Sequence, residues 1–215
     1  ANIVFGSQLL EAMTITGCKN IVNAGTSWQN FHSEDYRPVN LYAATKQAFE
    51  DVLKYYHDAR SVSCVTLKLF DTYGPNDSRR KLIKILVEAA LEHRPIDLSP
   101  GDQLLDLSHV DDVCDSFIKA ADYLLCANAP LCESFTVFGE RMTVKQLVLL
   151  ISDALQVEIR ANFGGRPYRE REVMVLPVCD STSAPWSQSS SGRRLFNEIT
   201  KLSASTSMPG SSHDA

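Results

Sequence analysis

The chain has 215 residues, of which 44% are hydrophobic and 22% are charged, and its formal net charge is -5. This composition is sufficient for a hydrophobic core in one domain or in two small ones. The acidic balance argues against nucleic acid as a partner, because there is no basic excess to neutralise phosphates. No apolar run approaches the roughly 20 residues that cross a bilayer, and the first residues lack the basic leader of a secretory signal. We therefore expect a cytoplasmic protein without a membrane partner.

The six cysteines are spread along the chain and form no C-x-x-C pair. A metal site needs clustered ligands, and a disulfide framework is typical of shorter secreted chains. We therefore expect buried, reduced thiols and no metal site. The cysteines are Cys18, Cys64, Cys114, Cys126, Cys132 and Cys179.

Helical and strand-like patterns alternate along the chain. In order, we expect helix 3–13, a buried strand ending in small residues near 24, helix 40–59, strand 61–70 with a turn at 71–77, helix 79–93, a short strand and helix over 106–125, strand 134–139, helix 143–155 and strand 157–163. Such alternation indicates an α/β fold with a largely parallel sheet. Ligands of these sheets lie at the carboxyl ends of the strands. The segments after Ala24 and after Phe70 are therefore the candidate functional regions.

The last part of the chain, from about Asp180, is rich in serine and poor in large apolar residues. Such a segment cannot bury enough apolar surface to offset the entropy of ordering. We expect a disordered tail at 179–215, within which 193–202 could form a short helix.

Tyr42 and Lys46 are four residues apart in the predicted helix 40–59. Four residues are about one helical turn, so both side chains project from the same face. Taken alone, this spacing also fits a surface pair of no consequence. The context is more specific, because the helix follows a strand end that carries Thr26 and Ser27, and "LKLFDTYGPND" and "SPGDQLLDLSHVDDV" come later.

This ordered set of motifs, over roughly residues 1–178, resembles the extended short-chain dehydrogenase/reductase family, in particular its NAD(P)-dependent sugar-nucleotide epimerases, dehydratases and reductases. The resemblance implies the carboxyl part of a Rossmann-type doubly wound parallel sheet plus a small α/β substrate-binding region. It divides the chain into residues 1–75, with the Tyr-Lys helix, and residues 76–178, of which about 111–139 return to the Rossmann sheet.

The resemblance also implies the catalytic residues. Lys46 would hydrogen-bond the nicotinamide ribose and favour the phenolate of Tyr42. Tyr42 would exchange a proton with a sugar hydroxyl or ketone, while NAD or NADP exchanges a hydride at the same carbon. Thr26 would hold the reacting oxygen by hydrogen bonding, although a strand-end cap is the alternative for this residue.

The resemblance implies further residues that contact the cofactor and the substrate. Besides Tyr42 and Lys46, the cofactor-binding residues would be Phe70, Tyr73, Gly74 and Pro75. The substrate-binding residues would be Ser27, Asp71 and Arg169, with Arg166 and Arg171 as alternatives to Arg169 in binding a diphosphate. Two positions depart from many relatives, which have asparagine in place of Asp71 and arginine in place of Leu105. His109 and Asp111 fit a loop anchored by hydrogen bonds.

The glycine-rich turn that binds the dinucleotide pyrophosphate in this family is missing from the sequence. We therefore expect an N-terminally truncated enzyme. Ser27 and Trp28 stand where the family's dehydratases carry an Asp-Glu pair, which favours a 4-epimerase or a 4-keto reductase of a nucleotide-linked (deoxy)hexose for bacterial surface polysaccharide. The alternative is an inactive fragment or dimerising remnant. The resemblance also implies a homodimer through helices 2–16 and 40–59.

Overall fold

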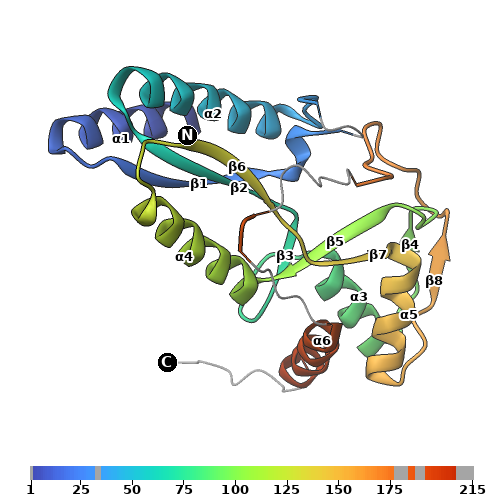
Figure 1. Cartoon of the computed structure of the whole chain (residues 1–215). Helices are drawn as coiled ribbons and strands as arrows, with labels where there is room; N and C mark the ends of the chain where they lie inside the picture. The colour runs from blue at the N-terminus through green and yellow to red at the C-terminus, as the bar shows by residue number, and fades with distance from the viewer. Residues whose placement is uncertain (1, 32–34, 177–183, 187–191, 207–215) are drawn as a thin grey trace, which may run out of the picture.

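The computed structural model describes residues 2–31, 35–176, 184–186 and 192–206, within which strands and helices alternate (Figure 1). The helices are α1 (Asn2–Thr16), α2 (Leu41–Arg60), α3 (Leu82–Leu91), α4 (Val110–Cys126), α5 (Val144–Leu155) and α6 (Gly192–Thr206), with a short 3-10 helix, η1 (Ser27–Gln29). The strands are β1 (Asn20–Thr26), β2 (Ser63–Leu69), β3 (Asp71–Tyr73), β4 (Ile96–Leu98), β5 (Leu104–His109), β6 (Cys132–Val137), β7 (Glu140–Thr143) and β8 (Ala161–Phe163).

The first sheet is parallel and has the strand order β1-β2-β6. Helices α1 and α2 cover one face of this sheet and α4 covers the other (Figure 1). Strand β2 shows why both faces must be covered, since its side chains alternate between them. Cys64 packs in the cluster with α1 and α2, whereas Val65 and Leu67 pack against α4. This arrangement confirms the predicted α/β class with a doubly wound parallel sheet.

A second sheet, of order β3-β5-β7, and a two-stranded pair, β4-β8, form the other half of the structure. Strands β3 and β5 are parallel, while β5 and β7 are antiparallel. Asp106 of β5 lies opposite Arg141 of β7, and their side chains form an ion pair. A separate hydrophobic cluster gathers residues of α3, α5 and α6 against these strands. The short strands β3, β4 and β7 had no counterpart among the predicted elements.

Two helices begin at caps that are visible in the sequence. Thr143 caps α5, because its hydroxyl accepts a hydrogen bond from the backbone of Gln146 and the Gln146 side chain accepts one in return. Asn40 caps α2 by accepting a hydrogen bond from the backbone of Ala43 at 3.0 Å. The second cap fixes where the Tyr-Lys helix starts.

Helix α6 corrects the expectation of a disordered tail. It spans Gly192–Thr206 and is therefore longer than the short helix expected at 193–202. Leu195 and Ile199 are fully buried against α3 and α5. Two apolar anchors one turn apart are enough to dock an otherwise polar helix, although the serine-rich composition around it hides this signal. Residues 179–183, 187–191 and 207–215 of the predicted tail lie outside the described residues.

The five cysteines in the described part of the chain are free thiols, but not all are buried. Cys18, Cys114 and Cys126 are exposed, which corrects the expectation of buried thiols. Cys114 and Cys126 lie on the solvent side of the amphipathic helix α4. Cys179 lies outside the described residues. Within the same residues, none of the helices combines the length and the hydropathy that a bilayer span requires.

Candidate active site

Tyr42 and Lys46 lie on one face of α2, as their spacing predicts. The ammonium nitrogen of Lys46 is 5.8 Å from the centroid of the Tyr42 ring. The Tyr42 side chain is 50% exposed, so the phenol is open to a ligand. The pair therefore combines a fixed cation with an accessible hydroxyl.

Lys46 is anchored to the first sheet. Its ammonium donates a hydrogen bond to the carbonyl oxygen of Ala24 in β1 at 2.9 Å. Burial lowers the pKa of Lys46 from its usual value, and the nearby carboxyl of Glu50 opposes that shift. Glu50 therefore helps to keep Lys46 protonated in a partly desolvated position.

Thr26 is the last residue of β1 and is buried. Its hydroxyl caps η1 by accepting a hydrogen bond from the backbone of Trp28 at 3.4 Å. Its own backbone N–H donates to the side-chain oxygen of Gln29 at 2.9 Å. The strand-end cap anticipated as an alternative for Thr26 is thus present. Capping uses a lone pair of the hydroxyl and leaves its proton available for a second bond.

A buried polar network connects Thr26 with α2. The fully buried Gln29 side chain donates to Glu50 at 2.8 Å and to Gln47 at 2.7 Å. Burial raises the pKa of Glu50, against the opposing effect of its hydrogen bond from Gln29. A β-carbon on Gly25 would lie only 3.0 Å from the Gln29 amide oxygen and 3.1 Å from a Glu50 oxygen, so glycine permits this close approach. Gln29 and Glu50 were not among the predicted site residues, although Glu50 stands one turn after Lys46.

A cleft of about 490 Å³ opens beside this network. It brings together residues from η1, β3, the segment before α3 and the segment after β8. Six predicted site residues line it: Ser27, Phe70, Asp71, Tyr73, Gly74 and Arg169. Thr26, Tyr42, Lys46 and Pro75 are not among the lining residues, although Thr26 directly precedes Ser27.

Cationic side chains are concentrated on the cleft wall. Arg79, Arg80 and Lys81 precede α3, and Arg166, Arg169 and Arg171 follow β8. Five arginines and two lysines, Lys81 and Lys84, line the cleft and outnumber its four carboxylates, and this cationic excess suits an anion such as a diphosphate. The second group was predicted from the sequence but the first was not, because the two groups are far apart along the chain.

Arg169 and Arg171 have different surroundings. The Arg169 side chain is 76% exposed, and its Nε lies 3.8 Å from a Glu172 oxygen. Arg171 donates to the carbonyl oxygens of Pro38 and Val39 at 2.8 Å and 3.0 Å, and its guanidinium stacks over Phe31. Arg171 therefore holds the segment before α2, which leaves Arg169 better suited to bind a ligand.

Asp71 lies at the cleft wall in β3, where it is open to solvent on one side and surrounded by protein on the others. This environment raises the pKa of Asp71, and the charges of Lys81 and Arg169 oppose the shift. The Asp71 carboxyl group therefore holds its proton more firmly than an ordinary aspartate does.

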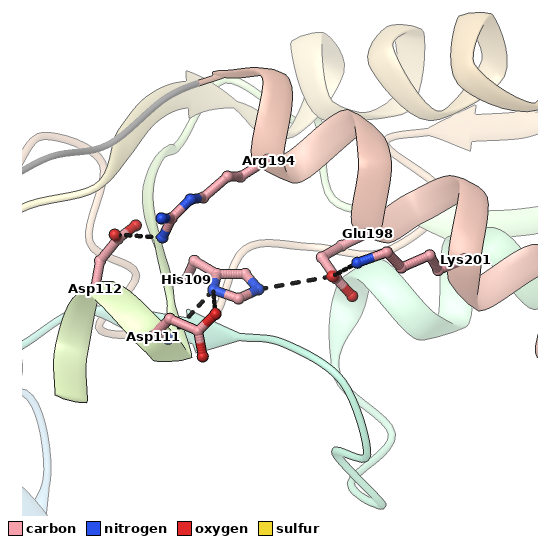
Figure 2. Close-up of polar contacts among 6 residues, drawn as sticks. All are labelled: His109, Asp111, Asp112, Arg194, Glu198 and Lys201. Carbon is pink, nitrogen blue, oxygen red and sulfur yellow. Dashed lines mark hydrogen bonds and ion pairs between the residues drawn. The ribbon is translucent and has the colours of Figure 1, made fainter. Parts of the chain in front are cut away.

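His109 and Asp111 have structural partners (Figure 2). The His109 ring caps α4, because its Nδ1 accepts a hydrogen bond from the backbone of Asp111 at 3.2 Å. Its Nε2 lies 3.8 Å from Glu198 of α6, and Arg194 of the same helix pairs with Asp112. These contacts match the anchored-loop interpretation and join α6 to the start of α4.

A parallel sheet covered by helices on both faces is the architecture of a Rossmann-type α/β protein. Residues 1–125 match the profile of the NAD dependent epimerase/dehydratase family, and the chain belongs to this family. The predicted family is thereby confirmed.

Curated proteins of known name match this chain at low sequence identity. The chain is 28% identical over 170 residues to a CDP-abequose synthase of Yersinia pseudotuberculosis, covering 77% of this chain and 58% of the relative. It is 31% identical over 130 residues to a UDP-glucuronate 4-epimerase of Thermodesulfobacterium geofontis, covering 56% of this chain and 40% of the relative. The chain thus spans less than two thirds of the length of these relatives.

Solved structures of other proteins share the fold. MoeE5 in complex with UDP-glucuronic acid and NAD superposes with a TM-score of 0.77 at 20% identity, covering 96% of this chain and 72% of that one. UDP-glucose 4-epimerase of Thermus thermophilus in complex with NAD gives a TM-score of 0.73 at 21% identity, covering 94% and 70%. At these identities the likeness establishes the fold alone.

Proposed function

We propose that the chain carries the catalytic part of an NAD(P)-dependent epimerase or 4-keto reductase that acts on a nucleotide-linked (deoxy)hexose. The observation that carries this proposal is the accessible Tyr42 phenol on the same helix face as Lys46, whose ammonium is bonded to the end of β1. The chemistry named by the relatives, CDP-abequose synthase and UDP-glucuronate 4-epimerase, supports the substrate class.

In this proposal three side chains divide the proton chemistry. Tyr42 exchanges a proton with the hydroxyl or ketone oxygen at the reacting sugar carbon. Lys46 stabilises the phenolate form of Tyr42 by its positive charge. Thr26 keeps its proton and holds the same sugar oxygen by donating a hydrogen bond from its hydroxyl. The nicotinamide, when bound, supplies or accepts the hydride.

The residues of this chain fit one end of a dinucleotide. Lys46 and Tyr42 would hold the nicotinamide ribose, and Phe70, Tyr73, Gly74 and Pro75 would line the ring. Phe70 and Gly74 already lie at the cleft wall beside Ser27. The 215 residues include no glycine-rich pyrophosphate turn, so the fit covers the reactive end of NAD or NADP and not the pyrophosphate.

The substrate would lie in the cationic cleft. Arg169 would bind the diphosphate, because its side chain is largely exposed and belongs to the segment that lines the cleft. Ser27 and Asp71 would contact the sugar. No acidic pair follows Thr26, which favours epimerisation or keto reduction over dehydration.

A homodimer through α1 and α2 is part of the proposal. Val4, Phe5 and Ile15 of α1 are 66%, 68% and 83% exposed, and burying such apolar side chains between two subunits would favour association. We also propose that residues 1–75, together with about 111–139, form the Rossmann part and that the rest of 76–178 forms the substrate-binding region. An inactive, dimerising remnant is the alternative function.

Calorimetric titration of the purified chain with NADH and NADPH tests the proposal. We expect binding that Lys46→Ala weakens by about 10- to 100-fold, the loss typical of a charged hydrogen-bond partner. Tyr42→Phe keeps the Lys46 ammonium, so it should weaken cofactor binding less than Lys46→Ala does, and it should abolish turnover of a nucleotide sugar. Lys54→Ala, on an exposed position of α2, is the matched control and should bind normally. A folded chain that binds neither cofactor would support the remnant instead.

A further inference from the structure

Cys64 and Cys132 face each other across two parallel strands. Cys64 is in β2 and Cys132 begins β6, and the register pairs them directly. Their sulfur atoms are 2.8 Å apart, and the Cys64 thiol is the hydrogen-bond donor. Direct register partners project from the same face of a sheet. The two thiols are therefore neighbours because of the sheet itself and not because of a chance side-chain conformation.

The backbone around the two thiols is fixed by hydrogen bonds. The N–H of Cys64 donates to the carbonyl oxygen of Leu131 at 2.8 Å, and the N–H of Leu131 donates to the hydroxyl of Ser63 at 3.3 Å. Adjacent strands lie about 4.8 Å apart, which falls within the range of Cα separations that a disulfide spans. A bond between the sulfurs therefore requires side-chain rotation and no movement of the strands.

The two sulfurs differ in access to solvent. Cys64 is 1% exposed and packs with Leu10, Leu53 and Val62 beneath α1 and α2. Cys132 is only partly buried, at the edge of the same cluster. Burial and the hydrogen bond with Cys132 raise the pKa of the Cys64 thiol. An oxidant in solution therefore reaches Cys132 first. Cys64 is the neighbouring thiol that can react with the oxidised Cys132.

We propose that Cys64 and Cys132 form a reversible intramolecular disulfide when the protein meets a peroxide. The sulfur of Cys132 attacks the O–O bond of hydrogen peroxide, which gives a sulfenic acid and releases water. The Cys64 sulfur then attacks the sulfenic sulfur, the S–O bond breaks, and the hydroxyl leaves as water with the Cys64 proton. Two thiols and one peroxide thus become one disulfide and two waters. A dithiol such as dithiothreitol reverses the reaction.

The disulfide would act on stability and not on the cleft. Cys64 is at the amino end of β2, whereas the cleft residues Phe70 and Asp71 follow the carboxyl end of that strand. A cross-link between positions 64 and 132 closes a long loop in the unfolded chain, which disfavours unfolding. The oxidised protein should therefore resist unfolding more than the reduced protein, while the cleft keeps its shape.

To test the proposal, the folded chain is treated with hydrogen peroxide and its remaining thiols are blocked with N-ethylmaleimide. The protein is then digested without reductant. To prevent links between molecules, Cys18, Cys114, Cys126 and Cys179 are first replaced by serine. Mass spectrometry should find one peptide pair that joins Cys64 to Cys132 and lacks two hydrogen atoms. The urea midpoint of the oxidised chain should rise and return to its original value with dithiothreitol.

Cys132→Ser in the same background is the matched control and should give neither the joined peptides nor the rise in midpoint. A second comparison does not depend on the folding of that variant, since the parent chain is also oxidised after unfolding in urea. Joined peptides that form only in urea would overturn the proposal, because the folded sheet would not then promote the reaction. Folded chain with both thiols still open to alkylation after peroxide treatment, or with Cys132 oxidised and Cys64 unlinked, would overturn it equally.

Discussion

Asp106 and Arg141 form an ion pair between directly opposed positions of β5 and β7, with 3.0 Å between Arg141 Nε and Asp106 Oδ2. The Asp106 side chain is fully buried, and its other oxygen accepts a hydrogen bond from the backbone of Gly139 at 2.6 Å. The Arg141 guanidinium lies over the rings of Phe70 and Phe138. The Asp106 carboxylate therefore joins β5 to β7 and to Gly139. Through Arg141 it also connects these strands with Phe70 at the cleft wall.

Replacing Asp106 by alanine should be strongly destabilising. The change removes the buried carboxylate that accepts hydrogen bonds from the Gly139 N–H and from Arg141 Nε, and breaking one side of such a pair costs about 3 kcal/mol. Urea unfolding measures the loss. Glu92→Ala is the control, since Glu92 pairs with Arg94 at the exposed surface, and the change there should be small. Similar losses in the two variants would contradict the role given to Asp106.

Glu50 predicts a pH dependence of stability. Its folded pKa is raised from 4.5 by burial, so ionising it costs more in the folded than in the unfolded protein. The stability that the protonated carboxyl contributes is full below about pH 4 and is lost as pH rises through the folded pKa. The free energy of unfolding of the natural chain relative to Glu50→Gln should therefore fall as pH rises above about 4.5.

Urea titrations at several pH values would measure this difference. Asp58→Asn, which removes a carboxylate from the exposed side of α2, controls for the loss of a negative charge. A difference between the natural chain and Glu50→Gln that stays constant with pH would show that burial of Glu50 has no such effect.

Helix α6 should contribute measurably to folding. Leu195 is fully buried, and its replacement by alanine should cost about 2–5 kcal/mol, as for other core leucines. Phe196 is the next residue on the helix and is 36% exposed, so Phe196→Ala is a matched control with a smaller expected effect. Thermal unfolding of the two variants provides the comparison. If Leu195→Ala melted like the natural chain, the docking of α6 would be refuted.

Arg169 and Arg171 should differ in what their loss affects. Arg169→Ala should weaken binding of CDP or UDP by about 10- to 100-fold, because a charge-assisted contact to the diphosphate is removed. It should leave the melting temperature unchanged, because the Arg169 side chain is largely exposed in its ion pair with Glu172. Arg171→Ala should lower the melting temperature, because the bonds to Pro38 and Val39 are lost.

Calorimetric titration and thermal melting of both arginine variants measure the two effects. Arg94→Ala, on the surface away from the cleft, is the control for a general loss of positive charge. Equal weakening by Arg169→Ala and Arg94→Ala would mean that Arg169 acts only through long-range attraction.

The sequence predicts the elements whose length makes their periodicity visible. Helices α2 and α5 follow apolar spacing, and Thr143 marks the start of α5 by a local cap. Strands β3, β4 and β7 have three or four residues each, too few for an alternation to stand out. Helix α6 was anticipated only as a short helix at 193–202 within an expected disordered tail, because its buried residues lie in serine-rich surroundings.

In the candidate active site, the sequence likewise predicts local relationships and misses contacts between distant segments. The proximity of Tyr42 and Lys46 follows from one helical turn, so the sequence was sufficient to predict it. The contact between Gln29 and Glu50 depends on how η1 packs against α2, across 21 residues of sequence, and no local pattern encodes it. The cationic cleft likewise requires the folded arrangement of two distant segments.

The hydrogen bond from Lys46 to Ala24 fixes the rotational phase of α2 relative to the sheet. Each residue added to an α-helix turns the following side chains by about 100°. A single residue inserted between Tyr42 and Lys46 would therefore leave the ammonium on its carbonyl and turn the phenol roughly a quarter of the way around the helix. The composition of α2 would be almost unchanged, but the Tyr42 hydroxyl would face a different neighbour. The direction of the Tyr42 phenol relative to the sheet therefore depends on the number of residues between Tyr42 and Lys46.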